Sequence, residues 1–129
     1  MVAVAPSETR SHTILIAEDE VLVRIMVAEA LRDAGYAVIE AIDADEAIRV
    51  LRTSADVKLL ISDIRMPGSM DGVALARVVR AEHPGVKVLL VSGDLTGVCP
   101  TEHDGAFLKP YNVSRLLRAV ENLLASGTA

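Results

Sequence analysis

The sequence has very few aromatic residues and a single cysteine. Its 129 residues include two tyrosines, one phenylalanine and no tryptophan, while hydrophobic residues make up 51%. The core must therefore consist of Val, Leu, Ile and Ala, and the hydrophobic content is too high for a disordered chain. Because Cys99 has no second cysteine to pair with, an internal disulfide is excluded, and a reduced, cytoplasmic compartment is expected.

Long apolar runs and positive charge are also scarce. No apolar stretch reaches the ~20 residues that a membrane-spanning helix needs. The N-terminus lacks the basic and apolar segments of a signal peptide. A formal charge of -5 and a pI of about 5.1 argue against direct nucleic-acid binding, because such proteins usually carry a basic patch. We therefore expect one domain with neither a membrane nor a nucleic acid as partner.

Short apolar runs alternate with segments of helical periodicity. Five runs are predicted to be strands, at 14–17, 36–40, 59–63, 86–91 and 106–108. Four helices are predicted from their inner faces, which are Val23, Met26, Val27, Ala30, Leu31 and Ala34; Ala44, Ala47, Ile48 and Leu51; Leu75, Val78 and Val79; and Val113, Leu116, Leu117, Val120 and Leu124. Asp43 with Glu46, and Asn112, are typical helix caps. This alternation predicts an α/β fold, a doubly wound five-stranded parallel sheet.

Some segments do not fit this pattern. Residues 1–11 are predicted to be a flexible leader and 126–129 a tail, with the domain at 12–125. Between the last two strands, residues 94–105 contain Gly97 and Pro100 and no helical stripe of apolar residues. The helix expected in that place is therefore shortened or irregular, since Gly and Pro disfavour helices.

Polar residues stand where four of the predicted strands end. The third strand closes with Asp63, just before a Met-Pro-Gly break that neither a strand nor a helix continues through. The carboxyl ends of parallel strands share one edge of the sheet, where ligands bind in open α/β folds. The residues expected at this edge are Glu18, Asp19, Asp63, Ser92 and Lys109.

These side chains together suggest phosphoryl chemistry. Clustered carboxylates repel one another, and a divalent cation relieves this repulsion. Mg²⁺ prefers such an oxygen-rich, partly hydrated site. A carboxylate is also a nucleophile that forms an aspartyl phosphate. Mg²⁺, Lys109 and the hydroxyl of Ser92 would then bind the oxygens of the phosphoryl group.

Five motifs in this order resemble the receiver domain of bacterial two-component response regulators, in the single-domain form of the chemotaxis regulator. The motifs are Glu18-Asp19, Asp63 with Met66-Pro67-Gly68, Asp71-Gly72, Ser92-Gly93 and Lys109-Pro110. The resemblance covers about residues 12–125. It implies a flavodoxin-like (βα)5 fold with the strand order 2-1-3-4-5.

The resemblance also implies a role for each site residue. Asp63 resembles the phosphoacceptor, Ser92 the hydroxyl residue that moves toward the phosphoryl group, and Lys109 the lysine of the family site. The bond from this lysine to Pro110 is usually cis in the family. The implied Mg²⁺ ligands are Glu18 through water, Asp19, Asp63 and the backbone carbonyl of Arg65.

The sequence departs from the family pattern at three places. The loop 68–71 is one residue longer than usual, and the segment between the fourth and fifth strands is several residues shorter. The switch aromatic normally stands three residues before the lysine, where this chain has Ala106. The candidates for the switch aromatic are Phe107, in a shifted register, and Tyr111.

The favoured function is phosphorylation-dependent signalling. A histidine kinase or a phosphotransfer protein would donate a phosphoryl group to Asp63, and segment 94–105 would be the mobile switch. With no output domain in view, we expect the protein to bind a downstream partner or to drain phosphoryl groups. The partner face is expected around Phe107, Tyr111, Arg115 and Arg118.

Two other functions stay open. A degenerate receiver would act as a constitutive interaction module, which the intact site residues disfavour. A Mg²⁺-dependent phosphohydrolase would resemble the dehalogenase-like phosphatases, which place a second Asp two residues after the nucleophile. Arg65 occupies that position here, so we do not expect an enzyme that turns over external substrates.

Overall fold

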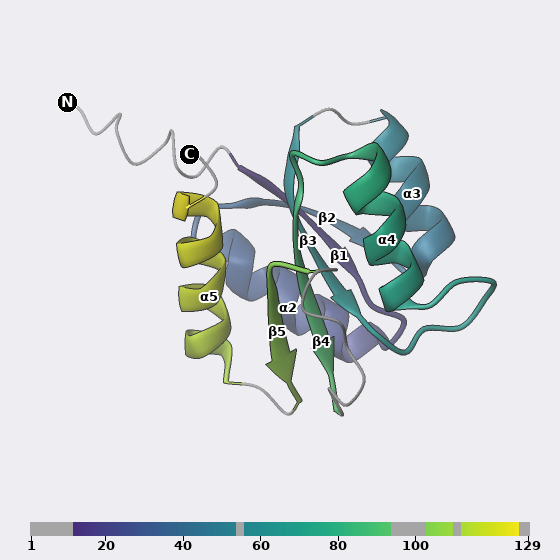
Figure 1. Cartoon of the computed structure of the whole chain (residues 1–129). Helices are drawn as coiled ribbons and strands as arrows, with labels where there is room; N and C mark the ends of the chain where they lie inside the picture. Colours follow the sequence, from purple (N-terminus) through teal and green to yellow (C-terminus); the bar gives the residue numbers. More distant parts are fainter. Residues whose placement is uncertain (1–11, 54–55, 94–102, 110–111, 127–129) are drawn as a thin grey trace.

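The computed structural model describes residues 12–53, 56–93, 103–109 and 112–126, which form a parallel sheet of five strands with helices on both faces (Figure 1). The elements in chain order are β1 (Thr13–Ala17), α2 (Val21–Asp33), β2 (Ala37–Ala41), α3 (Ala44–Thr53), β3 (Val57–Asp63), α4 (Gly72–Glu82), β4 (Lys87–Ser92), β5 (Gly105–Leu108) and α5 (Val113–Ser126). The strand order is β2-β1-β3-β4-β5, and all neighbouring strands are parallel. The predicted flavodoxin-like, doubly wound fold is thus confirmed.

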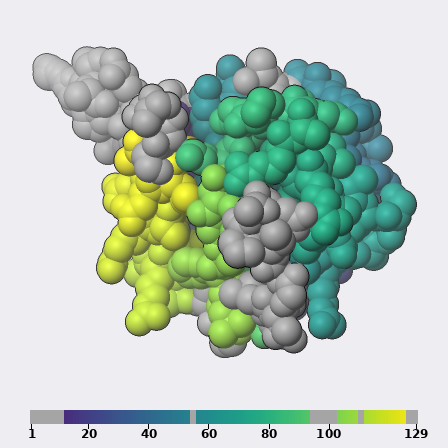
Figure 2. All heavy atoms as spheres, in the orientation of Figure 1, coloured from purple at the N-terminus to yellow at the C-terminus, as the bar shows by residue number. Residues whose placement is uncertain are grey.

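Two helix layers enclose two separate aliphatic cores. Helices α2 and α5 pack on one face of the sheet, and α3 and α4 pack on the other (Figure 1). In the space-filling view, α5 (yellow) and α4 (green) flank the edge of the sheet that β5 forms (Figure 2). Side chains alternate along each strand, so Leu59 and Ile61 of β3 enter the α2–α5 core while Leu60 enters the other. Such two-sided burial explains why the central strands are apolar runs.

The helix caps follow the sequence closely. The Asp43 carboxylate accepts the Glu46 N–H (2.9 Å), and the Glu46 carboxylate accepts the Ile42 N–H (2.8 Å). At α5, the Asn112 side chain accepts the Arg115 N–H (3.2 Å). The predicted inner face of α3 is also confirmed, because all four of its residues are buried. None of the helices within the described ranges is both long and apolar enough to span a membrane.

The predicted inner face of α2 is wrong in part. Val27, Ala28 and Leu31 are buried, whereas Met26 is 47% exposed and Ala34 lies beyond the helix end. The cause is that the first two turns of α2 carry apolar residues on two sides. Helical spacing alone then permits more than one inward face.

Some strand boundaries differ from the predicted ones. Strand β2 begins one residue later than predicted and β4 ends at Ser92, so this serine belongs to the strand. Three parts of the chain lie outside the described residues: the leader 1–11, segment 94–102 and most of the tail. The predictions on Cys99, on Tyr111 and on a shortened or irregular helix within 94–102 fall there as well.

Helix α4 begins directly against the end of β3. The Gly72 N–H donates to the Ile64 carbonyl (2.8 Å). A Cβ at Gly72 would overlap the Asp63 carbonyl oxygen and lie 2.8 Å from the Ile64 Cα. Only glycine therefore permits this approach of the two backbones.

We expect Gly72→Ala to destabilise the protein by about 1–3 kcal/mol, because the new methyl group meets backbone that cannot move aside. The matched control is Gly85→Ala, whose Cβ would meet nothing within 4 Å. That variant should stay within about 0.5 kcal/mol of the parent. Urea unfolding measures both changes, and equal stability of the two variants would contradict the steric argument.

Candidate functional site

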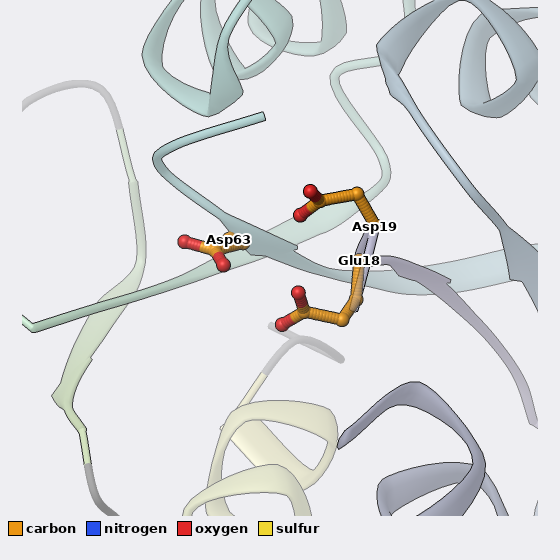
Figure 3. A group of neighbouring side chains, drawn as sticks. All are labelled: Glu18, Asp19 and Asp63. Atoms are coloured by element: carbon orange, nitrogen blue, oxygen red, sulfur yellow. The ribbon is translucent and has the colours of Figure 1, made fainter. Parts of the chain in front are cut away.

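Three carboxylates meet at the carboxyl edge of the sheet. Glu18 and Asp19 follow β1, and Asp63 is the last residue of β3. The two strands pair with Ala17 opposite Ser62, which brings their ends side by side. Oxygens of the three carboxylates lie within 4.8 Å of one another, and Figure 3 shows Glu18 and Asp19 extending toward the side of Asp63. Glu18 and Asp63 are buried and Asp19 is exposed.

Lys109 is the cation of the site. It follows β5, and its N–H donates to the Ser92 carbonyl (2.7 Å). Its Nζ lies 2.8 Å from Asp63 Oδ2 and 3.1 Å from Glu18 Oε1, so it bridges two of the three carboxylates. The lysine thus offsets part of their mutual repulsion.

Burial and charge shift two pKa values at the site. Burial, together with the charge of Asp63, raises the pKa of Glu18, although the Glu20 N–H and Lys109 act in the opposite direction. Burial lowers the pKa of Lys109, but its hydrogen bonds with Asp63 and Glu18 outweigh this, and the net pKa is raised. The ammonium therefore stays charged at neutral pH.

Asp63 is held through both its side chain and its backbone. Oδ1 accepts the Arg65 N–H (3.1 Å), while Oδ2 accepts from Lys109. The Ser62 hydroxyl donates to the Asp63 carbonyl (2.9 Å), the same oxygen that Gly72 approaches. The carboxylate is therefore fixed in direction before any ligand binds.

The exposed side of the site can admit a hydrated metal ion. Asp19 and Arg65 line an open groove together with Ile64, Met66, Pro67 and Asp71. Carboxylates from two strands beside such a groove match the preference of Mg²⁺ for a few oxygen ligands plus water. Asp19 and Asp63 would hold the ion directly and Glu18 would reach it through water, with the Arg65 backbone at the rim of the groove.

Ser92, Phe107 and the family's switch position, Ala106, lie at different places in the sheet. Ser92 is buried at the end of β4, one position beyond Val91, which pairs with Asp63. Phe107 pairs with Val91 and packs in the α2–α5 core, whereas Ala106 pairs with Leu90 of the opposite core. Phe107 therefore does not take the place of Ala106, because a shift by one residue reverses the face of a strand.

The predicted partner face is only partly exposed. Arg115 and Arg118 are exposed on α5, and Phe107 is partly buried. Leu108, which was not predicted to take part, follows Phe107 in the chain and is 55% exposed.

Three residues that support the site were not predicted from the sequence to do so. Ser62 and Gly72 contact the Asp63 carbonyl, and Arg24 donates to the Glu18 carbonyl (2.9 Å). Only Gly72 left a signal, as part of the Asp71-Gly72 motif, in which Asp71 caps α4 by accepting the Ala74 N–H. Contacts to backbone carbonyls leave no pattern of residue types along the chain.

Comparison with known proteins gives a consistent result. The family model of the response regulator receiver domain matches residues 14–121. The sensor kinase CckA of Brucella abortus is 35% identical over 120 residues, which is 88% of this chain and 13% of CckA. A response regulator receiver protein of Anaeromyxobacter is 38% identical over 106 residues, 82% of this chain and 43% of that protein. The chain thus spans less than half of either relative.

A solved structure of the same shape is TrrA, a response regulator protein of Thermotoga maritima in complex with Mg²⁺ and BeF. Its TM-score is 0.80 at 26% sequence identity, over 87% of this chain and 98% of that one.

We expect saturating Mg²⁺ to raise the thermal unfolding midpoint, because an ion that binds only the folded state stabilises it. The gain should be about 1.4 kcal/mol at ten times the Kd. Asp19→Ala should abolish this gain, while Asp33→Ala, which removes an exposed carboxylate at the end of α2, should keep it. A midpoint that does not respond to Mg²⁺, or an equal response in Asp19→Ala, would rule out the metal site.

Proposed function

Because the chain belongs to the response regulator receiver domain family of two-component systems, we propose that it accepts a phosphoryl group on Asp63 from the phosphohistidine of a histidine kinase or phosphotransfer protein. The observation that carries this proposal is the position of the Asp63 carboxylate. It lies within 4.8 Å of the oxygens of Glu18 and Asp19, and 2.8 Å from the Lys109 ammonium. These groups are the ones that a phosphoryl group needs around it.

In the proposed reaction, an oxygen of Asp63 attacks phosphorus. A P–O bond forms, the P–N bond of the phosphohistidine breaks, and its electron pair remains on the imidazole. Bound Mg²⁺ would neutralise charge on the phosphoryl oxygens. Lys109 already contacts Asp63 and would bind a second oxygen, and the Ser92 hydroxyl would donate to a third.

The same residues argue against turnover of external substrates. A phosphohydrolase needs a general acid beside the nucleophile to protonate the leaving group. Arg65 occupies the position two residues after Asp63, and its side chain is exposed. We therefore propose that the protein promotes only its own phosphorylation and dephosphorylation. A constitutive interaction module is the alternative, and the pairing of Lys109 with Asp63 and Glu18 disfavours it.

We place the donor on the outer side of α2. This helix begins two residues after Asp19, and its first turns expose Val21 (53%), Leu22 (79%), Ile25 (41%) and Met26 (47%). Any protein that delivers a phosphoryl group to Asp63 must cover the adjoining surface. Exposed apolar residues beside a charged site are typical of protein interfaces.

The phosphorylated protein would then act in one of two ways. It would bind a downstream protein through the α5 side, where Arg115 and Arg118 are exposed, or act as a sink for phosphoryl groups. Direct nucleic-acid binding is not part of the proposal, and the formal charge of -5 agrees with this. The donor and the chain would meet in the cytoplasm.

Incubation with acetyl phosphate and Mg²⁺ should add one base-labile phosphoryl mass to the parent. Asp63→Asn should take up none, because the amide is not a nucleophile, and Asp33→Asn should behave as the parent. Intact-mass spectrometry measures the uptake. The assignment of Asp63 fails if Asp63→Asn is labelled at the rate of the parent.

Leu22→Asp should slow phosphotransfer from the cognate histidine kinase, once phosphotransfer profiling has identified it, by about tenfold. A charge in the middle of an apolar contact costs ~1.4 kcal/mol or more of binding. Labelling by acetyl phosphate, which needs no docking surface, should stay unchanged in the same variant. An equal loss of phosphorylation rate with both donors would mean that the substitution damages the site. An unchanged rate with both would mean that the kinase binds another surface.

A further inference from the structure

Arg24 contacts the acidic site without touching any of its carboxylates. Its Nη1 donates to the backbone carbonyl of Glu18 (2.9 Å), and its Nε donates to Oε1 of Glu40 on β2 (3.1 Å). The side chain is 13% exposed, so the guanidinium is mostly shielded from water. Neither the sequence motifs nor the proposed reaction gives this residue a role.

The Arg24 bond completes the restraint of Glu18. The Glu18 N–H donates to the Ala41 carbonyl (3.0 Å), which extends the ladder between β1 and β2. The two carboxylate oxygens of Glu18 accept from Lys109 (3.1 Å) and from the Glu20 N–H (3.1 Å). Its carbonyl is the remaining polar group, and Arg24 binds it.

This carbonyl belongs to the peptide bond that leads into Asp19. Because a peptide unit is planar, fixing the oxygen also fixes the N–H and Cα of the next residue. Arg24 thereby restrains the backbone unit from which the Asp19 side chain extends. Asp19 is exposed, and its own side chain is not shielded by surrounding residues as Glu18 and Asp63 are.

Arg24 is itself anchored to the scaffold. The second oxygen of Glu40 accepts from Arg32 Nη1 (3.2 Å), and Arg32 Nη2 donates to the Val38 carbonyl (3.0 Å). A continuous set of hydrogen bonds thus runs from the β2 backbone through three side chains to the end of β1. Arg24 also lines a small, mostly apolar space beside Glu18 and Asp63, together with Val23 and Val27.

We propose that Arg24 is a positioning residue for the metal site, and that it holds the peptide between Glu18 and Asp19 so that both carboxylates face a bound Mg²⁺. This inference rests on the proposed function, in which Asp19 is a direct ligand. Groups that orient metal ligands typically contribute 10–100-fold to metal affinity. Arg24 would act on that affinity through the backbone alone.

The test compares Arg24→Met with Arg32→Met. Methionine keeps an apolar stem in place of each arginine and removes all its hydrogen-bond donors. Both variants lose a bond to Glu40, but only the first loses the bond to the Glu18 carbonyl. The Mg²⁺ Kd is measured by titration of backbone amide shifts in NMR, and the stability without metal is measured by urea unfolding.

We expect Arg24→Met to weaken Mg²⁺ binding about tenfold and to shift the metal-free Asp19 amide resonance. Arg32→Met should keep its Kd within twofold of the parent, even if it loses as much stability. Arg24→Lys should recover part of the affinity, because an ammonium can still donate to the carbonyl. An Arg24→Met Kd within twofold of the parent, or equal weakening in Arg32→Met, would overturn the inference.

Two outcomes separate this inference from the proposed function. If the parent protein does not bind Mg²⁺, the proposed metal site is overturned. If the parent and Arg24→Met bind Mg²⁺ with the same Kd, only the role of Arg24 is overturned. Should Arg24→Met fail to fold, Arg24→Lys and Arg32→Lys form the same comparison. The Arg24→Lys protein must then bind Mg²⁺ more weakly than the Arg32→Lys protein, and equal Kd values would contradict the inference.

Discussion

Repulsion among three carboxylates is the constraint on which the rest of the structure depends. Parallel strands place Glu18, Asp19 and Asp63 at one edge, within 4.8 Å of one another, and two of them are buried. Lys109 bridges the two buried ones but cannot neutralise all three charges. Without a bound metal ion, the remaining repulsion therefore costs stability. Two predominantly aliphatic cores, one on each side of the central strands, offset that cost.

Much of the site geometry is set through the backbone. Ser62 and Gly72 contact the Asp63 carbonyl, and Arg24 binds the Glu18 carbonyl. None of these three contacts uses a carboxylate oxygen. The carboxylates can then keep their directions while a ligand exchanges above them. Preorganisation of this kind lowers the reorganisation needed during reaction.

The sequence predicted those features that depend on local pattern. Strand alternation, helix caps and polar residues at strand ends are properties of short segments, so the parallel sheet and the membership of the acidic cluster followed from them. The strand order followed instead from the resemblance to the receiver family. The inner face of α2 did not, since Met26 and Val27 are equally apolar and only tertiary contacts decide which is buried. The support given by Arg24 could not be predicted either, because it joins a side chain to the carbonyl of Glu18, which every residue type possesses.

Asp63 connects the two cores, which are otherwise separated by the sheet. Its side chain bonds to Lys109, which directly follows β5 and lies two residues after Phe107 of the α2–α5 core. Its carbonyl lies against Gly72, where α4 of the opposite layer begins. A partner that binds either helix layer is therefore in a position to sense the state of Asp63. Such linkage is reciprocal: a partner that binds the phosphorylated form more tightly by some factor must favour phosphorylation by the same factor.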